Sequence, residues 1–541
     1  MEVTRDNFTE VLPRVLQGIE DASFVAFDLE MTGIFNSDKS KNNRKDDLPH
    51  RRYENMTGPA SKYHIVQVGI VCFRRNSGSG HTASYSASAF NFYIFPEKGP
   101  DIIMSPSTID FLRKNKMDFG KWINKGIPFA DAKEEEWLKK RYLEPITDAE
   151  EADLIVLTRE TDKEFFNRNW ANLIEYVEDT TGEVPEYVFE RCNTYLQRCI
   201  REQVRTRLPP HVLITKTDDG RLKATKMTTQ ELDAYKAQEK VNKERIFQEK
   251  MGFRTIFRKL MNTRVPLVGH NCFFDILFIL RWFDAPLENE FDLFRHRLAS
   301  QLPAIYDTKY IAACGILGQR YEDTTLSKCY QMFVTDRLRD VVSVSFMEGC
   351  EINEEKFHDA VWDAYCTGCV YINQLSLVHD ESRLTVSCLN RLFMMQSLYF
   401  MNLDPNEPHG FIRYDGLILH ISNFPPRTNS NDVMAPFLAS SIMSEELEIL
   451  WVDDKGLFVI VNSENITMTE TLKKIVRFPG DWIVRSYEEF LGHERKGALE
   501  ELTHGFVNSL FSIGRTISDS IFGSNDHCDE ENSPSKKRKR I

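Results

Sequence analysis

Residues 24–33 form an apolar stretch that ends in two closely spaced acids. Apolar and aromatic residues run from Phe24 to Phe27, which is typical of a strand covered on both faces. Because side chains alternate along a strand, the carboxylates of Asp28 and Glu30 point to the same face. Two adjacent negative charges are costly without a cation between them, and Mg²⁺ prefers carboxylate oxygens. The stretch fits a metal site, although two solvated acids at a strand end would give the same pattern.

Two distant segments carry further acids in helical patterns. Residues 267–277 predict a short strand, a glycine turn and an apolar helix, in which an unpaired Asp275 would be costly. A third segment places His358 five residues before Asp363, and we expect Asp363 to face inward and Asp359 to be solvated. Four carboxylates and one histidine are the groups needed for two-metal phosphodiester hydrolysis.

These motifs resemble those of a known nuclease group. Asp28-x-Glu30, Gly269-His270-Asn271 with Asp275, and His358-x4-Asp363 resemble the DEDD exonucleases, in the subclass that carries a histidine. Within that group the chain is most similar to the poly(A)-specific ribonuclease family of deadenylases, over about residues 1–490, with supporting stretches at residues 90–96, 107–112, 126–128, 307–309 and 358–368. The resemblance implies an α/β fold: an RNase H-like exonuclease core with an inserted small domain, followed by an RNA-recognition-motif-like α+β domain.

The resemblance also implies the role of each catalytic residue. Asp28, Glu30 and Asp363 would hold one Mg²⁺ that activates the attacking water, while Asp28 and Asp275 would hold a second beside the leaving 3′ oxygen. His358, whose ordinary pKa lies near neutrality, would accept the proton of that water. The implied activity is Mg²⁺-dependent 3′-to-5′ shortening of poly(A) tails with release of 5′-AMP.

The sequence indicates the preferred RNA substrate less clearly than it indicates the reaction. Adenine carries no charge, so preference for poly(A) must come from stacking, backbone contacts and strand shape. The family position of Met31 is usually aromatic, and the loss of a stacking ring keeps a second activity open, the 3′ trimming of non-adenylated small-RNA precursors such as piRNA. The family match places five residues along the RNA path: Met31, Ile34, Ile109, Phe111 and Lys309.

Two further classes of function share some of these features. An RNA-binding scaffold without activity is disfavoured because all five catalytic residues are present. A DNA exonuclease with the same acids is disfavoured by the RNA-recognition-like module. RNA 3′ ends, poly(A) RNA and the mRNA cap are therefore the expected partners, and family analogy adds a homodimer.

Length and composition are those of an ordinary soluble protein of two to four domains. The 541 residues are 42% hydrophobic and 28% charged, and no apolar run reaches membrane-spanning length. Eleven scattered cysteines, an odd number, favour a reducing compartment, and Cys366-x-x-Cys369 predicts packed helix cysteines. A net charge of −13 argues against a general polyanion binder but allows a local basic groove.

Five regions are expected along the chain. They are the nuclease core in two parts (1–140 and 251–400), an inserted basic, single-strand-binding-like domain (141–250), an RNA-recognition-like domain (410–490), and a largely disordered tail with a basic cluster (491–541). Within them, residues 133–141 predict a solvated helix and residues 392–399 an apolar helix.

The inserted region carries a basic cluster with two interpretations, a solvated face or an RNA contact. Arg207 and His211 have the Arg-x-x-x-His spacing of the small single-strand-binding domain found there in the family, but Pro209 and Pro210 forbid a regular helix between them. The cluster consists of Arg198, Arg201, Arg205, Arg207, Lys216, Arg221, Lys223 and Lys226.

The C-terminal part predicts the βαββαβ order of the RNA-recognition fold over residues 416–486. The usual aromatic stacking pair of this fold is poorly represented, because Phe458 is present but the first strand, residues 417–420, offers no aromatic partner. Trp451 matches the family position that stacks on the 7-methylguanosine cap, although a core role fits Trp451 equally. Five consecutive basic residues at 536–540 resemble a nuclear localisation signal and predict a protein of nucleus and cytoplasm, although solubilising tails have the same composition.

Overall fold

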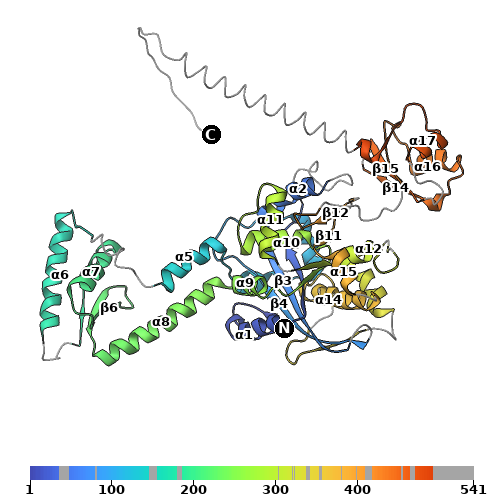
Figure 1. The fold of residues 1–541 in the computed structure, drawn as a ribbon. Helices are drawn as coiled ribbons and strands as arrows, with labels where there is room; N and C mark the ends of the chain where they lie inside the picture. Colours follow the sequence, from blue (N-terminus) through green and yellow to red (C-terminus); the bar gives the residue numbers. More distant parts are fainter. Residues whose placement is uncertain are drawn as a thin grey trace, which may run out of the picture. The chain divides into compact units, whose positions relative to one another are not determined.

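The computed structural model shows two compact units, divided after Ile412. It describes residues 1–35, 48–78, 82–144, 155–179, 185–302, 304–319, 321, 323–336, 342–352, 356–378, 381–395, 397, 399–407, 417–452, 455–462 and 469–490. Part of the stretch after Ile34 and the whole basic tail, 491–541, thus lie outside the described residues. The predicted α/β class is confirmed (Figure 1).

The first unit is built on one sheet, which has seven strands within the described residues. Their order is β1-β4-β3-β2-β8-β9, with β10 beside β4. The strands β2, β8 and β9 are parallel, whereas β3 is antiparallel to both of its neighbours, β2 and β4. The bounds are β1 (Glu2–Val3), β2 (Phe24–Met31), β3 (Ile65–Ser77), β4 (Ser84–Tyr93), β8 (Leu267–Gly269), β9 (Ile305–Asp307) and β10 (Ser343–Phe346).

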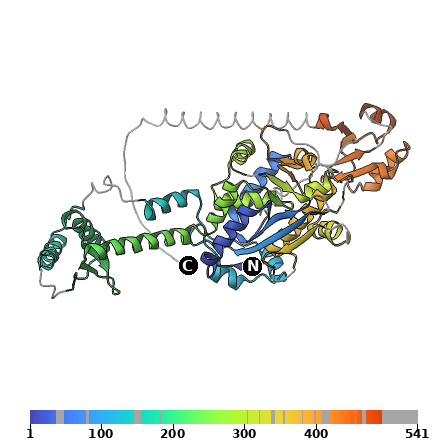
Figure 2. The same ribbon diagram turned by 60° about the horizontal axis from the view of Figure 1, so that its bottom comes forward.

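Helices cover both faces of this sheet (Figure 2). Helix α14 (Ala360–Leu377) covers the face that carries the cross-strand row Phe24, Phe73 and Ala87, and its residues Val361, Ala364 and Ile372 share one apolar core with that row. The opposite face carries Val25 and Phe27 and packs against α9 (Phe253–Thr263) and α10 (Phe273–Phe283). The alternation along β2 therefore fixes which residues can reach α14.

Further helices complete the first unit. They are α1 (Phe8–Asp21), α2 (Pro49–Lys62), α3 (Pro106–Lys114), α4 (Phe119–Lys125), α11 (Phe291–Gln301), α12 (Thr308–Ala313), α13 (Leu326–Tyr330) with the π-helical turn Gln331–Thr335, and α15 (Glu381–Cys388). No helix within the described residues is long and apolar enough to cross a membrane.

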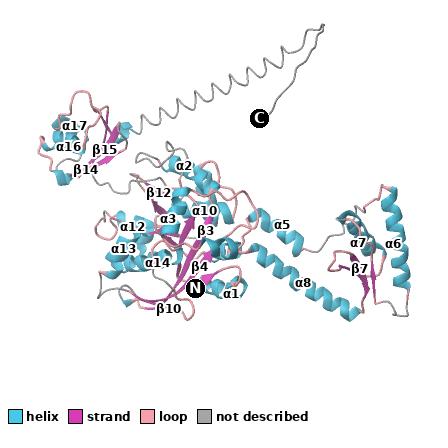
Figure 3. Ribbon diagram, turned by 180° about the vertical axis from the view of Figure 1, so that it is seen from behind, coloured by secondary structure: helices cyan, strands magenta, loops and turns pink. Residues whose placement is uncertain are grey.

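The inserted segment has a small core of its own. Helices α5 (Ala132–Tyr142) and α8 (Thr229–Met251) lead into and out of it. It contains α6 (Glu160–Glu178), α7 (Thr194–Arg207) and a sheet in the order β5-β7-β6, with bounds Glu186–Val188, Leu222–Lys226 and Val212–Lys216 (Figure 3). Leu173, Phe189 and Leu222 are buried in that core.

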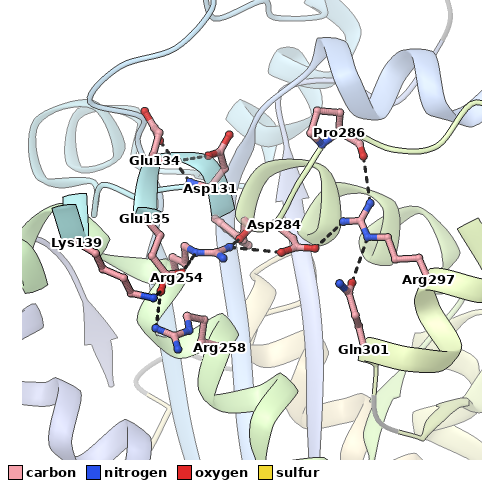
Figure 4. A network of polar contacts seen from close by, with 11 residues as sticks. Asp131, Glu134, Glu135, Lys139, Arg254, Arg258, Asp284, Pro286, Arg297 and Gln301 are labelled. Carbon is pink, nitrogen blue, oxygen red and sulfur yellow. Dashed lines mark hydrogen bonds and ion pairs between the residues drawn. The ribbon is translucent and has the colours of Figure 1, made fainter. Parts of the chain in front are cut away.

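The prediction that residues 133–141 form a solvated helix is wrong at Glu135 and Leu138, which are buried. Glu135 of α5 is buried, and it accepts hydrogen bonds from Arg254 Nε at 2.6 Å and Arg258 Nη1 at 2.6 Å (Figure 4). Lys139 pairs with the same carboxylate. Burial raises the pKa of Glu135, but the hydrogen bonds from Lys139 and Arg254 outweigh it and lower the pKa. This network joins α5 to α9, and its partners lie too far apart in sequence to be recognised there.

The prediction of a helix over residues 392–399 is also wrong. Strand β11 (Arg391–Phe393) pairs antiparallel with β12 (Phe400–Asn402). Asn390 adopts a left-handed conformation, with φ of 57°, and its amide donates to the carbonyl of Ile305 at 2.9 Å. The pairing with β12 takes up the backbone of residues 391–393, and Asn390 bonds to β9 about 85 residues away along the chain, through its amide and its side chain.

The second unit has the predicted βαββαβ order. Its sheet runs β14-β15-β13-β16, and α16 (Ser430–Leu438), α17 (Thr469–Ile475) and the 3-10 turn Ser444–Glu446 connect the strands. One sheet face, with Leu419 and Val459, packs on the helices. The strand bounds are β13 (Leu417–Ser422), β14 (Leu447–Trp451), β15 (Gly456–Val461) and β16 (Ile483–Ser486).

Candidate active site

Asp28 and Glu30 lie on the face of β2 that α14 covers. The register pairs Asp28 with Gly69 and Glu30 with Gln67 on β3. On this face of the sheet, the two acids therefore come directly after the apolar residues of the core. Asp363, in the first turn of α14, points at these two acids. One carboxylate oxygen each from Asp28, Glu30 and Asp363 lies within 4.8 Å of the others. The structure thus brings together acids from segments more than 300 residues apart.

This convergence depends on a close approach between α14 and the sheet. A Cβ placed on Gly69 would lie 2.0 Å from the carbonyl oxygen of Ala360, the first residue of α14. A second contact of this kind is made by Gly368, whose Cβ would lie 2.1 Å from the ring of Phe73. Glycine at both positions lets the helix lie close enough to place Asp363 over Asp28.

Asp275 reaches the same site from α10. Its buried carboxyl accepts a hydrogen bond from the backbone amide of Leu29, the residue between Asp28 and Glu30. Burial raises the pKa of Asp275 to about 7, while that hydrogen bond and one from its own amide oppose the shift. Asp275 lies outside the cluster of 4.8 Å, but it raises the pKa values of both strand acids.

The acid cluster is electrostatically incomplete. Burial, followed by the charges of Asp363 and Asp275, raises the pKa values of Asp28 and Glu30 well above their usual range. Burial likewise raises the pKa of Asp363 to about 7. Asp363 Oδ2 accepts from the His358 amide at 3.1 Å, but its Oδ1 is buried without a hydrogen-bond partner. A divalent cation would satisfy that oxygen and offset the repulsion, so the residues fit such an ion.

His358 is exposed, and its backbone amide donates to Asp363 of this cluster. Its backbone is left-handed, with φ of 65°, and its ring meets the edge of Phe111, with 4.8 Å between ring centroids. Burial and the charge of Lys356 lower the pKa of the imidazole. The ring is therefore neutral near pH 7 and able to accept a proton.

Asp359 was expected to be solvated, and this prediction is wrong. Its carboxylate is half-buried and accepts hydrogen bonds from Asn91 Nδ2, at 3.0 Å to Oδ1 and 3.3 Å to Oδ2. The sequence contained no sign of this partner, because Asn91 lies on β4, 268 residues earlier in the chain.

A further buried acid, Asp307, organises the Gly269-His270-Asn271 segment. Fully buried at the end of β9, it accepts hydrogen bonds from the amides of Asn271 at 2.8 Å, Lys309 at 3.0 Å and Phe393 at 2.9 Å. Asn271 is left-handed, with φ of 57°. Sequence reasoning assigned Asp307 no role, although an acid directly after a strand and before a helix is a recognisable helix cap.

The comparisons with known proteins agree with this geometry. Residues 3–371 match the model of the CAF1 family ribonuclease. The chain belongs to this family. Its membership confirms the predicted resemblance and the prediction that the chain is an exoribonuclease of the DEDD type.

Several members of the group are similar to this chain. The poly(A)-specific ribonuclease PARN of Danio rerio is 25% identical, over 92% of this chain and 78% of its own length. The pre-piRNA 3′-exonuclease trimmer of Bombyx mori is 25% identical, over 69% of this chain and 70% of its own. The solved structure of S. pombe Pop2p, in a form with bound Mg²⁺ and Mn²⁺, is 15% identical, over 72% of this chain and 98% of its own. Its TM-score with this chain is 0.35.

The five residues that the family match places along the RNA path have different surroundings. Ile34 and Phe111 are exposed, Ile109 is half-buried, and Met31 is buried, with 8% of its surface exposed. Lys309 donates to the carbonyl of Thr324 at 2.9 Å and lies over the ring of Phe393. Phe111 is the one of the five that contacts a predicted catalytic residue through its ring.

In the insert, Arg207 and His211 do not lie on one helix. Helix α7 ends at Arg207, whose guanidinium lies over the ring of Trp170, and His211 precedes β6. The two prolines between them separate a helix end from a strand start, as their backbone limits require.

In the second unit, Trp451 and Phe458 have different surroundings. Trp451 is half-buried, donates from Nε1 to Ser430 Oγ at 3.0 Å and lines a pocket of about 340 Å³ with Phe424 and Arg427. Phe458 is fully buried against Phe490, with 5.1 Å between ring centroids. Cys366 and Cys369, in the first unit, are packed in α14 as predicted.

Proposed function

We propose that this protein is a Mg²⁺-dependent 3′-to-5′ exoribonuclease that shortens poly(A) tails and releases 5′-AMP. The observation that carries the proposal is the clustering of the Asp28, Glu30 and Asp363 carboxylates within 4.8 Å, with Asp275 bonded to the strand between the first two. The names of the Danio rerio and Mus musculus relatives, both poly(A)-specific ribonucleases, support the choice of substrate.

The chain supplies the ligands and the base for this reaction. Two Mg²⁺ ions, one held by Asp28, Glu30 and Asp363 and the other by Asp28 and Asp275, would activate water and stabilise the leaving oxygen when bound. His358 accepts a proton from the water, which attacks the phosphorus of the last phosphodiester. The bond to the 3′ oxygen of the preceding nucleotide breaks, and that oxygen leaves on the shortened RNA.

The surroundings of His358 support binding of an RNA 3′ end. Phe111, which contacts the His358 ring, exposes 43% of its surface, and Ile34, which the family match places on the RNA path, exposes 39%. Apolar surfaces of this kind take bases by stacking and contact. Met31 offers no ring and is buried. Base selection at that position is thus weaker than an aromatic residue would give, which supports trimming of non-adenylated small RNAs as a second candidate function. The name of the Bombyx mori relative agrees with this candidate.

The test uses 5′-labelled RNAs that share one body and end in A, U or mixed-sequence tails. We expect Mg²⁺-dependent shortening, fastest on the A tail, and a loss of at least ~1,000-fold in Asp28→Asn, because a lost metal ligand forfeits several kcal/mol of transition-state stabilisation. Equal rates on all tails would replace deadenylation by general trimming. No shortening by the unaltered protein would overturn both functions.

Three finer points belong to this proposal. The Trp451 pocket suits the 7-methylguanosine cap, since an indole face attracts a cationic purine and Arg427 can meet its phosphates.

By family analogy the enzyme acts as a homodimer, which sedimentation of the full chain would test. The basic cluster at 536–540, outside the described residues, would direct part of the protein to the nucleus, and deleting it tests that role.

A further inference from the structure

Asn91 lies in the same cross-strand row as Asp28, and the reaction described above does not use it. The register pairs Asp28 on β2 with Gly69 on β3, and Gly69 with Asn91 on β4. Residues paired across antiparallel strands share a face of the sheet. The start of α14 rests on the middle of this row, because the Ala360 carbonyl occupies the space that a side chain on Gly69 would need. One row therefore has the metal-binding acid at one side of α14 and Asn91 at the other.

The amide of Asn91 holds the residue that follows His358. Its Nδ2 donates to both oxygens of Asp359, at 3.0 and 3.3 Å, and a hydrogen bond to a carboxylate is stronger than one between neutral groups. Asn91 itself cannot shift, since it is 2% exposed and its backbone amide donates to the Met1 carbonyl at 2.9 Å. The contact thus ties the entry of α14 to a rigid strand.

The buried amide also has a cost that packing alone does not explain. Asn91 Oδ1 is buried without a hydrogen-bond partner, which costs about 1–3 kcal/mol. An apolar residue of similar volume would avoid that cost at this position. The benefit must therefore come from the Nδ2 contact with Asp359.

The turn that Asp359 belongs to needs such support. His358 is left-handed, with φ of 65°, a conformation that costs a non-glycine residue roughly 1–2 kcal/mol. Two contacts fix its position on the catalytic side. They are the hydrogen bond from its backbone amide to Asp363 Oδ2 and the edge-to-face contact of its ring with Phe111. On the other side the Asn91–Asp359 pair holds the next residue in the chain. Without that pair, the turn can relax and move the imidazole away from the acids.

We propose that Asn91 is a positioning residue of the active site: by holding Asp359 it fixes the strained His358 turn and, with it, the base and Asp363 over the strand acids. The inference rests on the proposed function for its effect on hydrolysis. Its structural part, the fixed turn, stands independently of which RNA is cleaved.

The kinetic test compares Asn91→Ala, Asn91→Asp, Asp359→Asn and the exchanged pair Asn91→Asp/Asp359→Asn in the full chain. We expect Asn91→Ala to lower kcat by about 10–100-fold, the range for residues that orient catalytic ligands, with KM for RNA within about threefold. Asn91→Asp should lose more, because two carboxylates then face each other. The exchanged pair restores an amide opposite a carboxylate and should recover at least about tenfold over Asn91→Asp.

Asn373→Ala is the matched control. Asn373 is a buried amide of α14, 1% exposed, that donates to the Cys369 carbonyl at 2.9 Å, far along the helix from His358. Its loss should lower the free energy of unfolding without lowering kcat. If Asn373→Ala lowers kcat as much as Asn91→Ala, general destabilisation of α14 explains the effect and the positioning role is wrong.

A readout without catalysis separates this inference from the proposed function. In metal-free buffer, hydrogen exchange over residues 356–363 should rise in Asn91→Ala and stay unchanged in Asn373→Ala. Unchanged exchange in Asn91→Ala, or a kcat within twofold of the unaltered protein, would overturn the positioning role. If the unaltered protein cleaves no RNA, the proposed function fails, and the exchange result still decides whether Asn91 fixes the turn.

Discussion

The seven-stranded sheet of the first unit and the four-stranded sheet of the second unit use their polar and aromatic faces in opposite ways. In the first unit, the face of β2 beyond the apolar core carries acids whose negative charges repel one another. Asp363 of α14, which lies over them, has a buried Oδ1 without a hydrogen-bond partner. In the second unit, the face of β13 and β15 that would stack bases is closed by the chain itself. His420 and Phe458 contact Phe490 with ring centroids 4.5 and 5.1 Å away, and Phe458 is fully buried.

The difference separates a site from a core. The acid cluster lowers stability unless a cation binds, so its composition is explained by ligand binding. The aromatic cluster is satisfied by its own packing and needs no ligand. In the second unit, the open position is instead the pocket beside Trp451 at the end of β14. Fold order alone would have predicted base stacking on a face that Phe490 covers.

The largest effect that could break this comparison is expected from Phe458→Ala. If Phe458 is a core residue, its truncation should lower the free energy of unfolding of the second unit by about 3–5 kcal/mol, as for other buried phenylalanines. Urea unfolding of the full chain measures this, and hydrolysis of uncapped poly(A) should change less than twofold. Ile483→Ala, on the same sheet with 41% of Ile483 exposed, should cost less than about 0.5 kcal/mol. A stable Phe458→Ala variant with weaker RNA binding would show instead that the face is open.

The sequence predicted the catalytic segments because their chemistry is local. The spacing of Asp28 and Glu30 on a strand places both side chains on one face by backbone periodicity alone. His358 and Asp363 were recognised by their spacing, although His358 lies in a left-handed turn before α14 and not on the helix. The same holds for the βαββαβ order, in which each strand and helix has its own pattern. Convergence of the three acid segments followed from the resemblance, and no periodicity could have given it.

What the sequence did not show depends on contacts between remote residues. Glu135 looked solvated because its partners Arg254 and Arg258 lie 119 and 123 residues away. Residues 392–399 looked helical because apolar spacing does not reveal that Asn390 bonds to β9. Phe458 lies at a usual stacking position of the fold, but Phe490 packs against it. In each case a tertiary partner outweighed the local pattern.

The acid cluster should make the stability of the folded chain depend on pH. The folded-state pKa values of Asp275 and Asp363 are raised to about 7, mainly by burial, whereas unfolded aspartates titrate near pH ~4. A raised folded-state pKa means that the folded chain binds protons more tightly. The associated stability is present below pH ~4 and is lost as pH rises through about 7. The facing groups, Asp28, Glu30 and Asp359, have raised pKa values too.

Thermal unfolding in EDTA checks this expectation. The unaltered protein should lose stability between pH 5 and pH 8, on the order of a few kcal/mol for the cluster, and Mg²⁺ should restore it at pH 8. Asp363→Asn should be more stable than the unaltered protein at pH 8 in EDTA, with the difference shrinking toward pH 5. Glu136→Gln, an exposed acid of α5, should change neither profile. A flat profile for the unaltered protein would show that the cluster is not strained without metal.

The smallest effect is expected at the pocket beside Trp451 in the second unit. Removing the indole in Trp451→Ala should weaken binding of a 7-methylguanosine cap analogue by about tenfold, or about 1.4 kcal/mol, within the range for a cation on an aromatic face. Titration of tryptophan fluorescence or calorimetry with the analogue measures it. Trp451→Phe keeps a ring but loses the Nε1 hydrogen bond to Ser430, so it should retain most of the affinity. Since Trp451 also packs against Phe424, with 5.4 Å between ring centroids, stability must be measured in the same variants. A loss of stability with unchanged cap affinity would make Trp451 a core residue like Phe458, and the second unit would then contain no aromatic ligand site at either predicted position.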